Sequence, residues 1–386
     1  MEPRQPPSGR TVAVILAAGK STRMKSRLPK AVHPLCGRPM VWHVVSACRG
    51  AGISDVVVVI GHCGEVVQSA LAQAEGPGGG ERLSFAWQLE QRGTGHALMV
   101  AEPSIPQDAD CILVLPADAP LVTADDIARF VSLHRQEGND ATLLTAVLPD
   151  GGHYGRIVRS SDGSVQRIVE AKDADAETLA IREINAAIYC FRPERAFAAL
   201  KQIQPSNAQS EYYLTDVIGI LTNSGGRVGA VVSDDPSVVL GINHRAELAE
   251  VEALMRRRVL RSLMLSGVTI VDPASTYVDV GVEIGADTVV HPNTHVLGNS
   301  RIGEECVLGP NAVIADSVLG RGAKVVWSHV SRSQIGDGAV VGPFACLSNG
   351  CRVGAQTSVG CFMCLAGADA ADGTAVGTQG GDPCRD

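Results

Sequence analysis

Hydrophobic residues recur with two different periodicities along the chain, and the periodicity changes near residue 245. Before it, apolar runs without polar interruption are separated by stretches of helical periodicity. This is the pattern of strands buried on both faces that alternate with helices. It predicts an α/β domain with a mostly parallel sheet and helices on both faces. The expected strands lie in AVILAA, VVVVIG, CILVLPAD and ATLLTAVL, and the clearest helices span Met40–Gly52 and Thr123–Gly138.

Two segments mark how helices begin and connect. Thr123 with Asp126 three positions on resembles a capping box, and that helix is expected to end at Gly138. Asn243–Gly267 has apolar residues at helical spacing and is stopped by glycine. We interpret it as a linking helix packed on the first domain.

Beyond Val268 the apolar residues recur every six positions. Five-residue steps interrupt this spacing among Leu319, Val325, Val330 and Ile335. Six-residue steps are typical of a parallel β-helix, in which an apolar residue points inward at every step and small residues fit the turns. This accounts for the 42 glycines and for the aromatic content of only 4%. The six-residue series runs through Ile284, Val290, Val296, Ile302, Leu308 and Ile314, and again through Val341, Leu347, Val353 and Val359.

These patterns divide the chain into five segments. We expect a disordered tail over 1–10, an α/β domain over 11–243 and a linking helix over 244–267. A β-helix over 268–365 and an irregular tail over 366–386 follow. Because a solenoid needs a cap or partner chains to cover its ends and apolar faces, a homo-oligomer is expected.

The segment LAAGKSTRMKSRLPK, residues 16–30, contains the Gly-Lys-Ser of a P-loop but not its spacing. The P-loop pattern needs a glycine where Val14 stands. A basic, glycine-bearing loop after a buried strand still favours phosphate binding. Ligands of such sheets bind at the carboxyl ends of the strands, where 19–30 and 117–120 are expected.

Composition narrows the partners and the location. The net charge of −8, without any basic block that offsets it, argues against nucleic acid. The N-terminal MEPRQPPSGR lacks the apolar core of a signal peptide, and no apolar run approaches membrane-spanning length. Eleven cysteines without an export signal suggest reduced thiols. These features predict a cytoplasmic protein that does not insert into membranes.

Ordered motifs in both halves carry a family resemblance. They are LAAGKSTRMKSRLPKAVHPLCGRPM, QLEQRGTGHALMVAEP, ADAPLV, YGRIVR, IVEAKDA, EINAAIY, NAQSEYYLTDVI and GINHRAEL, followed by the hexapeptide repeats. The chain resembles the bifunctional bacterial UDP-N-acetylglucosamine pyrophosphorylase / glucosamine-1-phosphate N-acetyltransferase family, from about Val12 to about Ala345. The resemblance implies a Rossmann-like nucleotidyltransferase domain, a linking helix and a short left-handed parallel β-helix.

The resemblance assigns the catalytic and metal-binding residues. In uridylyl transfer a sugar-1-phosphate oxygen attacks the α-phosphate of UTP and expels pyrophosphate, so catalysis is chiefly charge neutralisation and positioning. Arg23 and Lys30, seven positions apart on the basic loop, suit a grip on the triphosphate. Asp118 and Asn243 would hold Mg²⁺ through oxygen atoms, since this ion takes few protein ligands beside phosphate and water.

The resemblance also assigns the substrate-binding residues. Gln88, Gly93 and Thr94 would bind the uracil, the glycine by letting backbone approach the base. Gly155, Glu170 and Asn185 would bind the sugar. Leu16, Ala17, Gly19 and Asn243 complete the expected substrate-binding set.

Two pairs of residues depart from the family pattern near this site. Pro116-Ala117 precede the metal-binding aspartate, and Ala186-Ala187 replace the Thr-Gly that usually follows the sugar-binding asparagine. The two methyl groups could tighten the pocket or change the preferred sugar.

The second activity of the family is expected to be absent. After VGPFA the family continues with Arg-Leu-Arg-Pro-Gly, then Asn-Phe-Val-Glu and a nearby lysine. Here the stretch reads CLSNGCRVGAQTSVGCFMCLAG and has none of these acceptor-binding residues, and the later coils with the catalytic histidine and acetyl-CoA site are not reached.

The stretch contains Cys346, Cys351, Cys361 and Cys364. We interpret them as packing residues, with a metal site or a disulfide as alternatives, and we expect Cys346 and Cys364 to stack on adjacent coils.

The function that fits best is Mg²⁺-dependent synthesis of UDP-N-acetylglucosamine and pyrophosphate from UTP and N-acetylglucosamine-1-phosphate, for cell-envelope precursors. A nucleotidyltransferase for another sugar, such as glucose-1-phosphate, is the nearest alternative. A non-catalytic nucleotide-binding scaffold is the second. A homotrimer is what the family resemblance implies.

Overall fold

The computed structural model describes residues 9–19, 22–76 and 83–377, and the chain divides into two compact units. The first unit comprises the described residues up to Pro34 and Pro39–Val251. The second comprises Leu35–Arg38 and the described residues from Glu252 onward. The expected 1–8 part of the disordered tail and the 378–386 part of the irregular tail lie outside the described residues.

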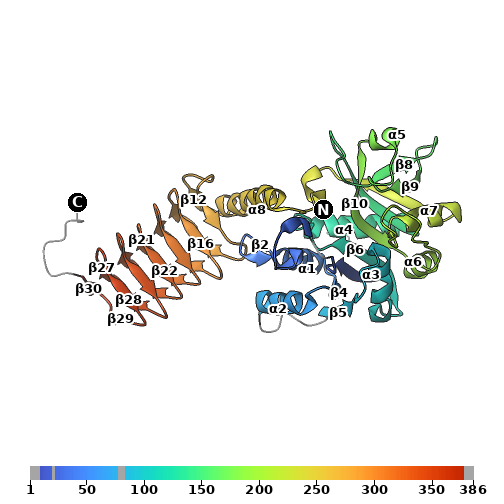
Figure 1. The fold of residues 1–386 in the computed structure, drawn as a ribbon. Helices are drawn as coiled ribbons and strands as arrows, with labels where there is room; N and C mark the ends of the chain where they lie inside the picture. The colour runs from blue at the N-terminus through green and yellow to red at the C-terminus, as the bar shows by residue number, and fades with distance from the viewer. Residues whose placement is uncertain (1–8, 20–21, 77–82, 378–386) are drawn as a thin grey trace. The chain divides into compact units, whose positions relative to one another are not determined.

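A twisted, mostly parallel sheet forms the centre of the first unit (Figure 1). Its main path is β11-β7-β10-β6-β1-β4-β5; β10 is antiparallel to both neighbours, and the other pairs are parallel. Strands β8 and β9 form an antiparallel extension on β10. The strands are β1 (Arg10–Leu16), β4 (Asp55–Ile60), β5 (Leu83–Trp87), β6 (Ala109–Pro116), β7 (Ala141–Val147), β8 (Arg156–Arg159), β9 (Val165–Val169), β10 (Glu183–Phe191) and β11 (Val228–Val232).

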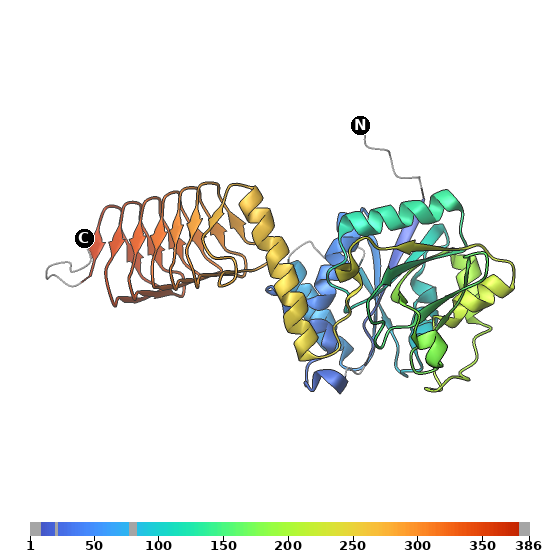
Figure 2. The same ribbon diagram turned by 90° about the horizontal axis from the view of Figure 1, so that it is seen from above.

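Helices cover both faces of this sheet, as the alternation of apolar runs predicts (Figure 2). One core contains side chains of α1, α2 and α4, and the other contains side chains of α3, α6 and α7. Successive residues of β1 enter opposite cores, because strand side chains alternate between faces. The helices are α1 (Met40–Gly50), α2 (Gly64–Glu75), α3 (Thr94–Ala101), α4 (Ala124–Glu137), α5 (Ala176–Leu179), α6 (Pro193–Leu200), α7 (Asp216–Asn223) and α8 (Arg245–Leu265).

The capping box predicted for the second clear helix is present. Thr123 precedes α4; its hydroxyl accepts from the Asp126 N–H, and the Asp126 carboxylate accepts from the Thr123 N–H at 3.0 Å. Gly138 closes the helix in a left-handed conformation. Among the described residues, no helix has the length and apolar character needed to cross a bilayer.

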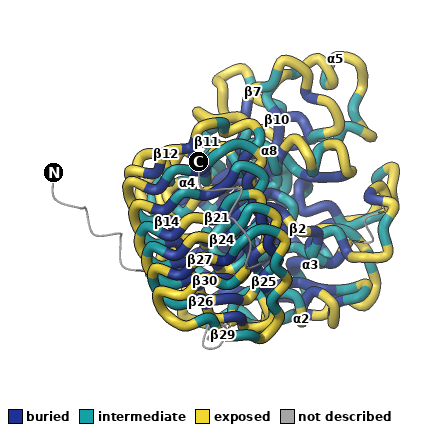
Figure 3. The backbone as a smooth tube through the Cα atoms, turned by 90° about the vertical axis from the view of Figure 1, so that its left-hand side faces the viewer, coloured by how far each residue is buried: buried dark blue, intermediate teal, exposed yellow. Residues whose placement is uncertain are grey.

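The second unit is a β-helix with three parallel sheets, one on each side of a prism, as expected for a left-handed hexapeptide β-helix. Up to β27 the inward residues of its strands are buried, while their neighbours are exposed or partly exposed (Figure 3). The 7-stranded sheet contains β12 (Thr269–Ile270), β15 (Val289–Val290), β18 (Val307–Leu308), β21 (Lys324–Val325), β24 (Val340–Val341), β27 (Ser358–Val359) and β30 (Ala375–Val376). One 6-stranded sheet contains β13 (Tyr277–Val278), β16 (His295–Leu297), β19 (Val313–Ala315), β22 (His329–Ser331), β25 (Cys346–Ser348) and β28 (Cys364–Ala366). The other contains β14 (Glu283–Ile284), β17 (Arg301–Ile302), β20 (Val318–Leu319), β23 (Gln334–Ile335), β26 (Arg352–Val353) and β29 (Asp369–Ala370).

The five-residue steps do not break the stack. Each contains one residue in a left-handed conformation two positions after the inward residue: Asp316, Trp327 and Arg332. Six-residue steps mostly place such a residue one position later, as at Asp287. The shorter turn therefore closes one residue earlier, and the strands on both sides stay in register.

The structure corrects the expected segment limits at three places. Strand β1 begins at Arg10, inside the expected tail, because the Arg10 guanidinium pairs with Asp55 and Asp108. The repeats continue past residue 365 through β29 and β30, so residues 366–377 are not irregular. Ala370 lies at an inward position there, and its small side chain gives little periodic signal. The division between units falls inside α8 rather than at its start, and Leu35–Arg38 joins the second unit because Cys36 accepts from the Val280 N–H at 3.0 Å.

The buried His134 predicts a pH-dependent stability. Burial and the charge of Arg135 lower its pKa to about 4, and its Nδ1 lies 2.8 Å from the Thr142 hydroxyl. The unfolded chain takes up this proton near pH 6.5, whereas the folded chain takes it up only near pH 4. The stability that the neutral His134 contributes is therefore complete above pH 6.5 and is lost as the pH falls toward 4. We expect the free energy of unfolding to decrease by about 2 kcal/mol from pH 7 to pH 5 through this group.

Urea unfolding at both pH values, followed by tryptophan fluorescence, measures this effect. A Trp327→Phe background leaves only Trp42 and Trp87, which both lie in the first unit. His134→Gln should remove this part of the pH dependence, whereas replacement of the exposed His62 by Gln should retain it. Equal slopes in the two variants would contradict the assignment.

Candidate active site

Every residue proposed from the sequence for catalysis, substrate or metal binding lines one cavity of about 690 Å³ in the first unit. The cavity lies at the carboxyl ends of β1 and β6, where a parallel sheet usually binds its ligand. The residues are Leu16, Ala17, Gly19, Arg23, Lys30, Gln88, Gly93, Thr94, Asp118, Gly155, Glu170, Asn185 and Asn243. Lys20 and Ser21 of the P-loop-like tripeptide lie outside the described residues.

Charged groups gather at one end of the cavity. Lys30 begins the short 3₁₀ helix η2 (Lys30–Val32), and its Nζ forms an ion pair with Asp118, which follows β6. Arg23 lies in η1 (Thr22–Met24), and its Nη2 donates to Asn243 Oδ1 at 2.8 Å. Lys30 Nζ lies 3.5 Å from the same oxygen. Segments from three distant parts of the chain therefore meet at one charged cluster.

The start of α8 fixes Asn243. The Glu247 carboxylate accepts from the N–H groups of Asn243 at 2.5 Å and His244 at 3.2 Å, while His244 Nδ1 accepts from the Glu247 N–H. This reciprocal cap satisfies N–H groups that have no partner within the helix. Asn243 Nδ2 also lies 3.0 Å from His153 Nε2, so its Oδ1 faces the cation end of the cavity.

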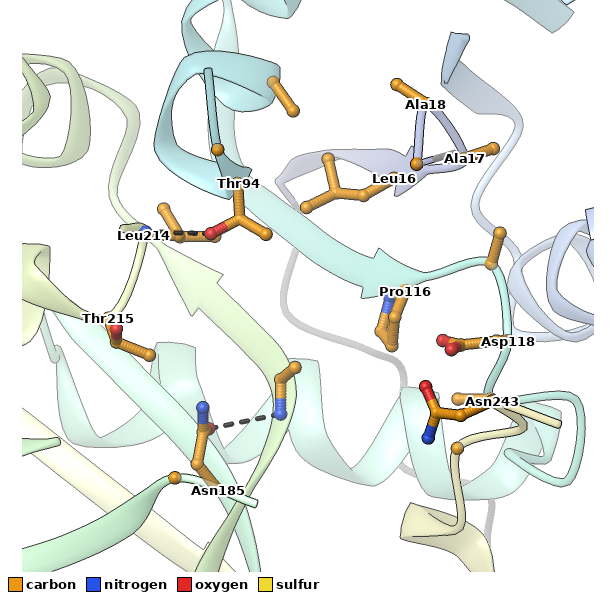
Figure 4. Close-up of a pocket in the computed structure, with 18 of the residues that line it drawn as sticks. Leu16, Ala17, Ala18, Thr94, Pro116, Asp118, Asn185, Leu214, Thr215 and Asn243 are labelled. Atoms are coloured by element: carbon orange, nitrogen blue, oxygen red, sulfur yellow. Dashed lines mark hydrogen bonds between the residues drawn. The ribbon is translucent and has the colours of Figure 1, made fainter. Parts of the chain in front are cut away.

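The oxygen donors of this cluster fit a hard divalent cation. The carboxylate of Asp118 and Oδ1 of Asn243 both contact the Lys30 ammonium, so they converge on a position already held by positive charge. Figure 4 shows the two side chains facing each other beside Pro116. No cluster of three or more His, Cys, Asp or Glu side chains suited to a metal occurs among the described residues. A cation here would therefore need ligand or water oxygens in addition.

The opposite end of the cavity is built around the start of α3. Thr94 Oγ1 accepts from the Leu214 N–H at 3.0 Å, a contact drawn in Figure 4. Gln88 Nε2 donates to the Gly93 carbonyl at 3.0 Å and lies 3.1 Å from His96 Nδ1. No hydrogen bond to Gln88 Oε1 occurs within the described part of the chain. This side chain is buried and oriented, and it keeps an acceptor for a ligand.

Gly93 is required by the protein's own backbone. Its φ is +105°, and a Cβ atom would lie 2.6 Å from the Tyr212 carbonyl oxygen. The Tyr212 carbonyl also accepts from the Gly95 N–H at 2.7 Å. The approach of a base to the backbone at Gly93 stays a prediction.

A third region, formed by β8 to β10, holds Gly155, Glu170 and Asn185. Glu170 Oε1 accepts from the Thr215 hydroxyl at 3.1 Å, and burial raises the pKa of this carboxyl. Asn185 is engaged at both ends of its amide: Oδ1 accepts from the Ala187 N–H at 3.1 Å, and Nδ2 donates to the Tyr189 hydroxyl at 2.6 Å. Ala187 has a φ of +57°, an uncommon conformation for a residue with a Cβ atom.

Several lining residues were missed by the sequence-based prediction. His153 and Tyr154 stack at 4.6 Å, and the Tyr154 hydroxyl accepts from the Gly241 N–H at 3.1 Å. Burial lowers the pKa of His153 and raises that of Tyr154. Tyr154 is the first residue of the motif YGRIVR and His153 directly precedes it, and this proximity is the signal that could have found them. Glu211, Leu214 and Thr215 of the NAQSEYYLTDVI segment also line the cavity, and Tyr212 of the same segment packs against Gly93.

The cysteine-rich stretch belongs to the second unit and not to this cavity. As expected, Cys346 and Cys364 are strand partners on adjacent coils. Cys351 is buried, and its Sγ lies 3.1 Å from the Ser348 carbonyl oxygen. Cys346 and Cys361 are partly exposed and Cys364 is exposed.

The fold and the comparisons with known proteins define a class, a nucleotidyltransferase whose catalytic domain is followed by hexapeptide repeats. Residues 13–265 match the MobA-like NTP transferase domain, and residues 281–316 match the bacterial transferase hexapeptide (six repeats).

The particular family follows from curated relatives, each called bifunctional protein GlmU. That of Caldanaerobacter subterraneus subsp. tengcongensis is 46% identical over 86% of this chain and 71% of its own length. Those of Heliobacterium modesticaldum and Brevibacillus brevis are 46% and 42% identical over 91% and 94% of this chain, and over 75% and 77% of their own. The chain belongs to the GlmU family.

Replacing Gly93 tests the backbone packing that shapes this cavity. Gly93→Ala should lower the free energy of unfolding by about 2–3 kcal/mol, because the methyl group meets Tyr212 and the left-handed φ is strained. Urea unfolding at pH 7 in the Trp327→Phe background measures it. Gly19→Ala is the matched control, since a Cβ there meets nothing within 4 Å, and it should change stability by less than about 0.5 kcal/mol. Equal losses would show that the Tyr212 contact is unimportant.

Proposed function

We propose that the chain transfers a uridylyl group from UTP to N-acetylglucosamine-1-phosphate, giving UDP-N-acetylglucosamine and pyrophosphate. The observation that carries the proposal is the shared cavity. Two cationic side chains and two hard oxygen donors lie at one end, and an oriented amide and a partly buried carboxylate lie elsewhere in its wall. GlmU family membership supports a sugar-1-phosphate uridylyltransferase as the general activity.

The nucleotide end suits a uracil. The imide N3–H of uracil is a donor, and Gln88 Oε1 supplies a matching acceptor because its Nε2 is held by Gly93 and His96. Cytosine has no hydrogen at N3 and would leave this acceptor unpaired, which is costly in a buried site.

The charged end suits the triphosphate. Arg23 and Lys30 would donate to phosphate oxygens and stabilise the charge that develops on the departing pyrophosphate. Asp118 and Asn243 would hold Mg²⁺, which neutralises phosphate charge when bound. A phosphate that accepts from Lys30 would leave the Asp118 carboxylate free of its ion pair and able to hold the cation. In the reaction, a phosphate oxygen of the sugar-1-phosphate bonds to the α-phosphorus while the bond to the β-phosphate bridging oxygen breaks.

The sugar end combines polar groups with two methyl groups. Glu170 would accept from sugar hydroxyls. Gly155 lies beside it, since a Cβ atom added at Gly155 would be 3.5 Å from Glu170 Oε2. Ala186 and Ala187 line the same wall and provide apolar contact for an N-acetyl group. Glucose-1-phosphate, without that group, is the alternative acceptor. A non-catalytic scaffold is disfavoured because no structural need explains two cations around an aspartate and an asparagine in an open cavity.

A panel of sugar-1-phosphates against UTP, dTTP and ATP tests the activity. Pyrophosphate release with Mg²⁺ should be fastest for UTP with N-acetylglucosamine-1-phosphate. Asp118→Ala should lower kcat by at least about 100-fold, because the phosphate charge loses its cation ligand. Asp125→Ala, which removes an exposed carboxylate in the first turn of α4, is the matched control and should retain activity. If no sugar-1-phosphate gives pyrophosphate, the enzyme proposal fails; if glucose-1-phosphate is best, the alternative acceptor is correct.

We also propose that the chain does not transfer acetyl groups to glucosamine-1-phosphate. The family resemblance places Arg-Leu-Arg-Pro-Gly directly after VGPFA, and this chain has Cys346, Leu347, Ser348, Asn349 and Gly350 there. None of these side chains supplies a permanent positive charge for a sugar phosphate. Incubation with acetyl-CoA and glucosamine-1-phosphate should release no free coenzyme A above the enzyme-free rate, and sustained release would refute the proposal. Assembly through the β-helix into a homo-oligomer, a trimer by family resemblance, is part of the same proposal.

A further inference from the structure

Two thiols lie in register on the outer face of the β-helix. Cys346 of β25 and Cys364 of β28 are direct strand partners, and both point outward because the next residues, Leu347 and Leu365, pack into the prism. Adjacent strands lie about 4.8 Å apart. This separation falls within the range of about 4.4–6.8 Å between the Cα atoms of disulfide-bonded cysteines.

The environment of the pair differs from that of the other cysteines nearby. Both thiols are free; Cys364 is exposed and Cys346 is partly exposed. Partial burial and the adjoining Cys364 thiol raise the pKa of Cys346. Cys351, in contrast, is buried and its Sγ contacts the Ser348 carbonyl. Reagents in solution can therefore reach this pair while Cys351 stays protected.

We propose that Cys346 and Cys364 form a reversible disulfide by exchange with a low-molecular-weight disulfide. The exposed Cys364, as its thiolate, attacks one sulfur of the small disulfide, forms a mixed disulfide and releases one small thiolate. Cys346, as its thiolate, then attacks the Cys364 sulfur, forms the protein disulfide and releases the second small thiolate. Two protein thiols are oxidised, the small disulfide is reduced to two thiols, and the two protons pass to the leaving groups.

The geometry makes this bond readily reducible. Side chains of register partners in parallel strands leave the backbone in the same direction, so their Cβ atoms stay about as far apart as the strands, about 4.8 Å. Disulfides prefer Cβ separations of about 3.5–4.5 Å, so closing the bond must draw the two coils together. Strained and exposed disulfides have the more oxidising potentials typical of labile bonds.

The bond would restrain the last described coils. Strands β28, β29 and β30 have no fully buried residue, whereas the inward residues of β25 to β27 are buried. In a solenoid each coil contacts only its neighbours, so opening can begin at the end of the stack. A cross-link between β25 and β28 ties the less buried coil to a well-packed one.

Oxidised glutathione added to the reduced full-length chain, followed by acid quenching, intact mass measurement and peptide mapping, tests the proposal. The expected product has lost two hydrogens and contains one peptide pair joined through Cys346 and Cys364. Cys346→Ser should stop at the mixed disulfide on Cys364, and Cys364→Ser should lose the product. Cys361→Ser, which removes a thiol on the same coil as Cys364, is the matched control and should give the wild-type product. Low concentrations of dithiothreitol should reverse the reaction.

Peptide mapping also separates the competing pairings, including those with Cys384, which lies outside the described residues. A cross-link between any other two cysteines, or mixed disulfides alone, would overturn the proposal. A trivalent arsenical such as phenylarsine oxide gives a second measurement, because it binds two adjacent thiols together. It should protect both cysteines from alkylation in the wild type and neither remaining cysteine in the single serine variants. Equal protection in the variants would show that the thiols do not act as a pair.

Discussion

The ion pair between Lys30 and Asp118 is the interaction on which the candidate site depends. It joins the loop after β1 to the end of β6, and the two strands that carry these segments are parallel neighbours paired from Arg10 to Leu16. Asn243 joins the same cluster through Arg23 and is fixed there by the cap of α8. The pair is only partly buried, with side-chain exposures of 21% and 17%. Such a pair can be exchanged for stronger partners, a phosphate for the lysine and a metal ion for the aspartate, without leaving an isolated charge in the interior.

Much of the fold could be predicted because its strands and repeats bury large branched side chains at regular spacing. VVVVI forms β4, and the inward residues of the β-helix are fully or nearly buried wherever they are valine, isoleucine or leucine up to Val359. The prediction failed where that signal was weak. Ala370 is an inward residue without a strong hydrophobic pattern, and Arg10 extends β1 through ion pairs rather than through apolar burial. Neither effect is visible in a periodicity.

The candidate site shows a similar division. Motif residues gathered in one cavity because strand order and loop length bring them there, but their individual contacts could not be predicted. Gly93 accommodates Tyr212, more than one hundred positions later in the chain, and His153 contacts Asn243 across ninety positions. Contacts between loops depend on where the sheet places their ends, and no local pattern records them. The sequence cannot distinguish a glycine that makes room for a bound base from one that makes room for the protein's own backbone.

The sugar end shows how such contacts change the meaning of a motif residue. Because both ends of the Asn185 amide bind within the chain, to Ala187 and Tyr189, this side chain first of all stabilises the irregularity in β10 between Asn185 and Tyr189. That irregularity sets Ala187 in its left-handed conformation on the cavity wall. Asn185 can still accept through a second lone pair of Oδ1, but its orientation is fixed before a sugar arrives. In the proposed reaction, selection among sugars would therefore depend more heavily on Glu170 and on the methyl groups of Ala186 and Ala187 in the same wall.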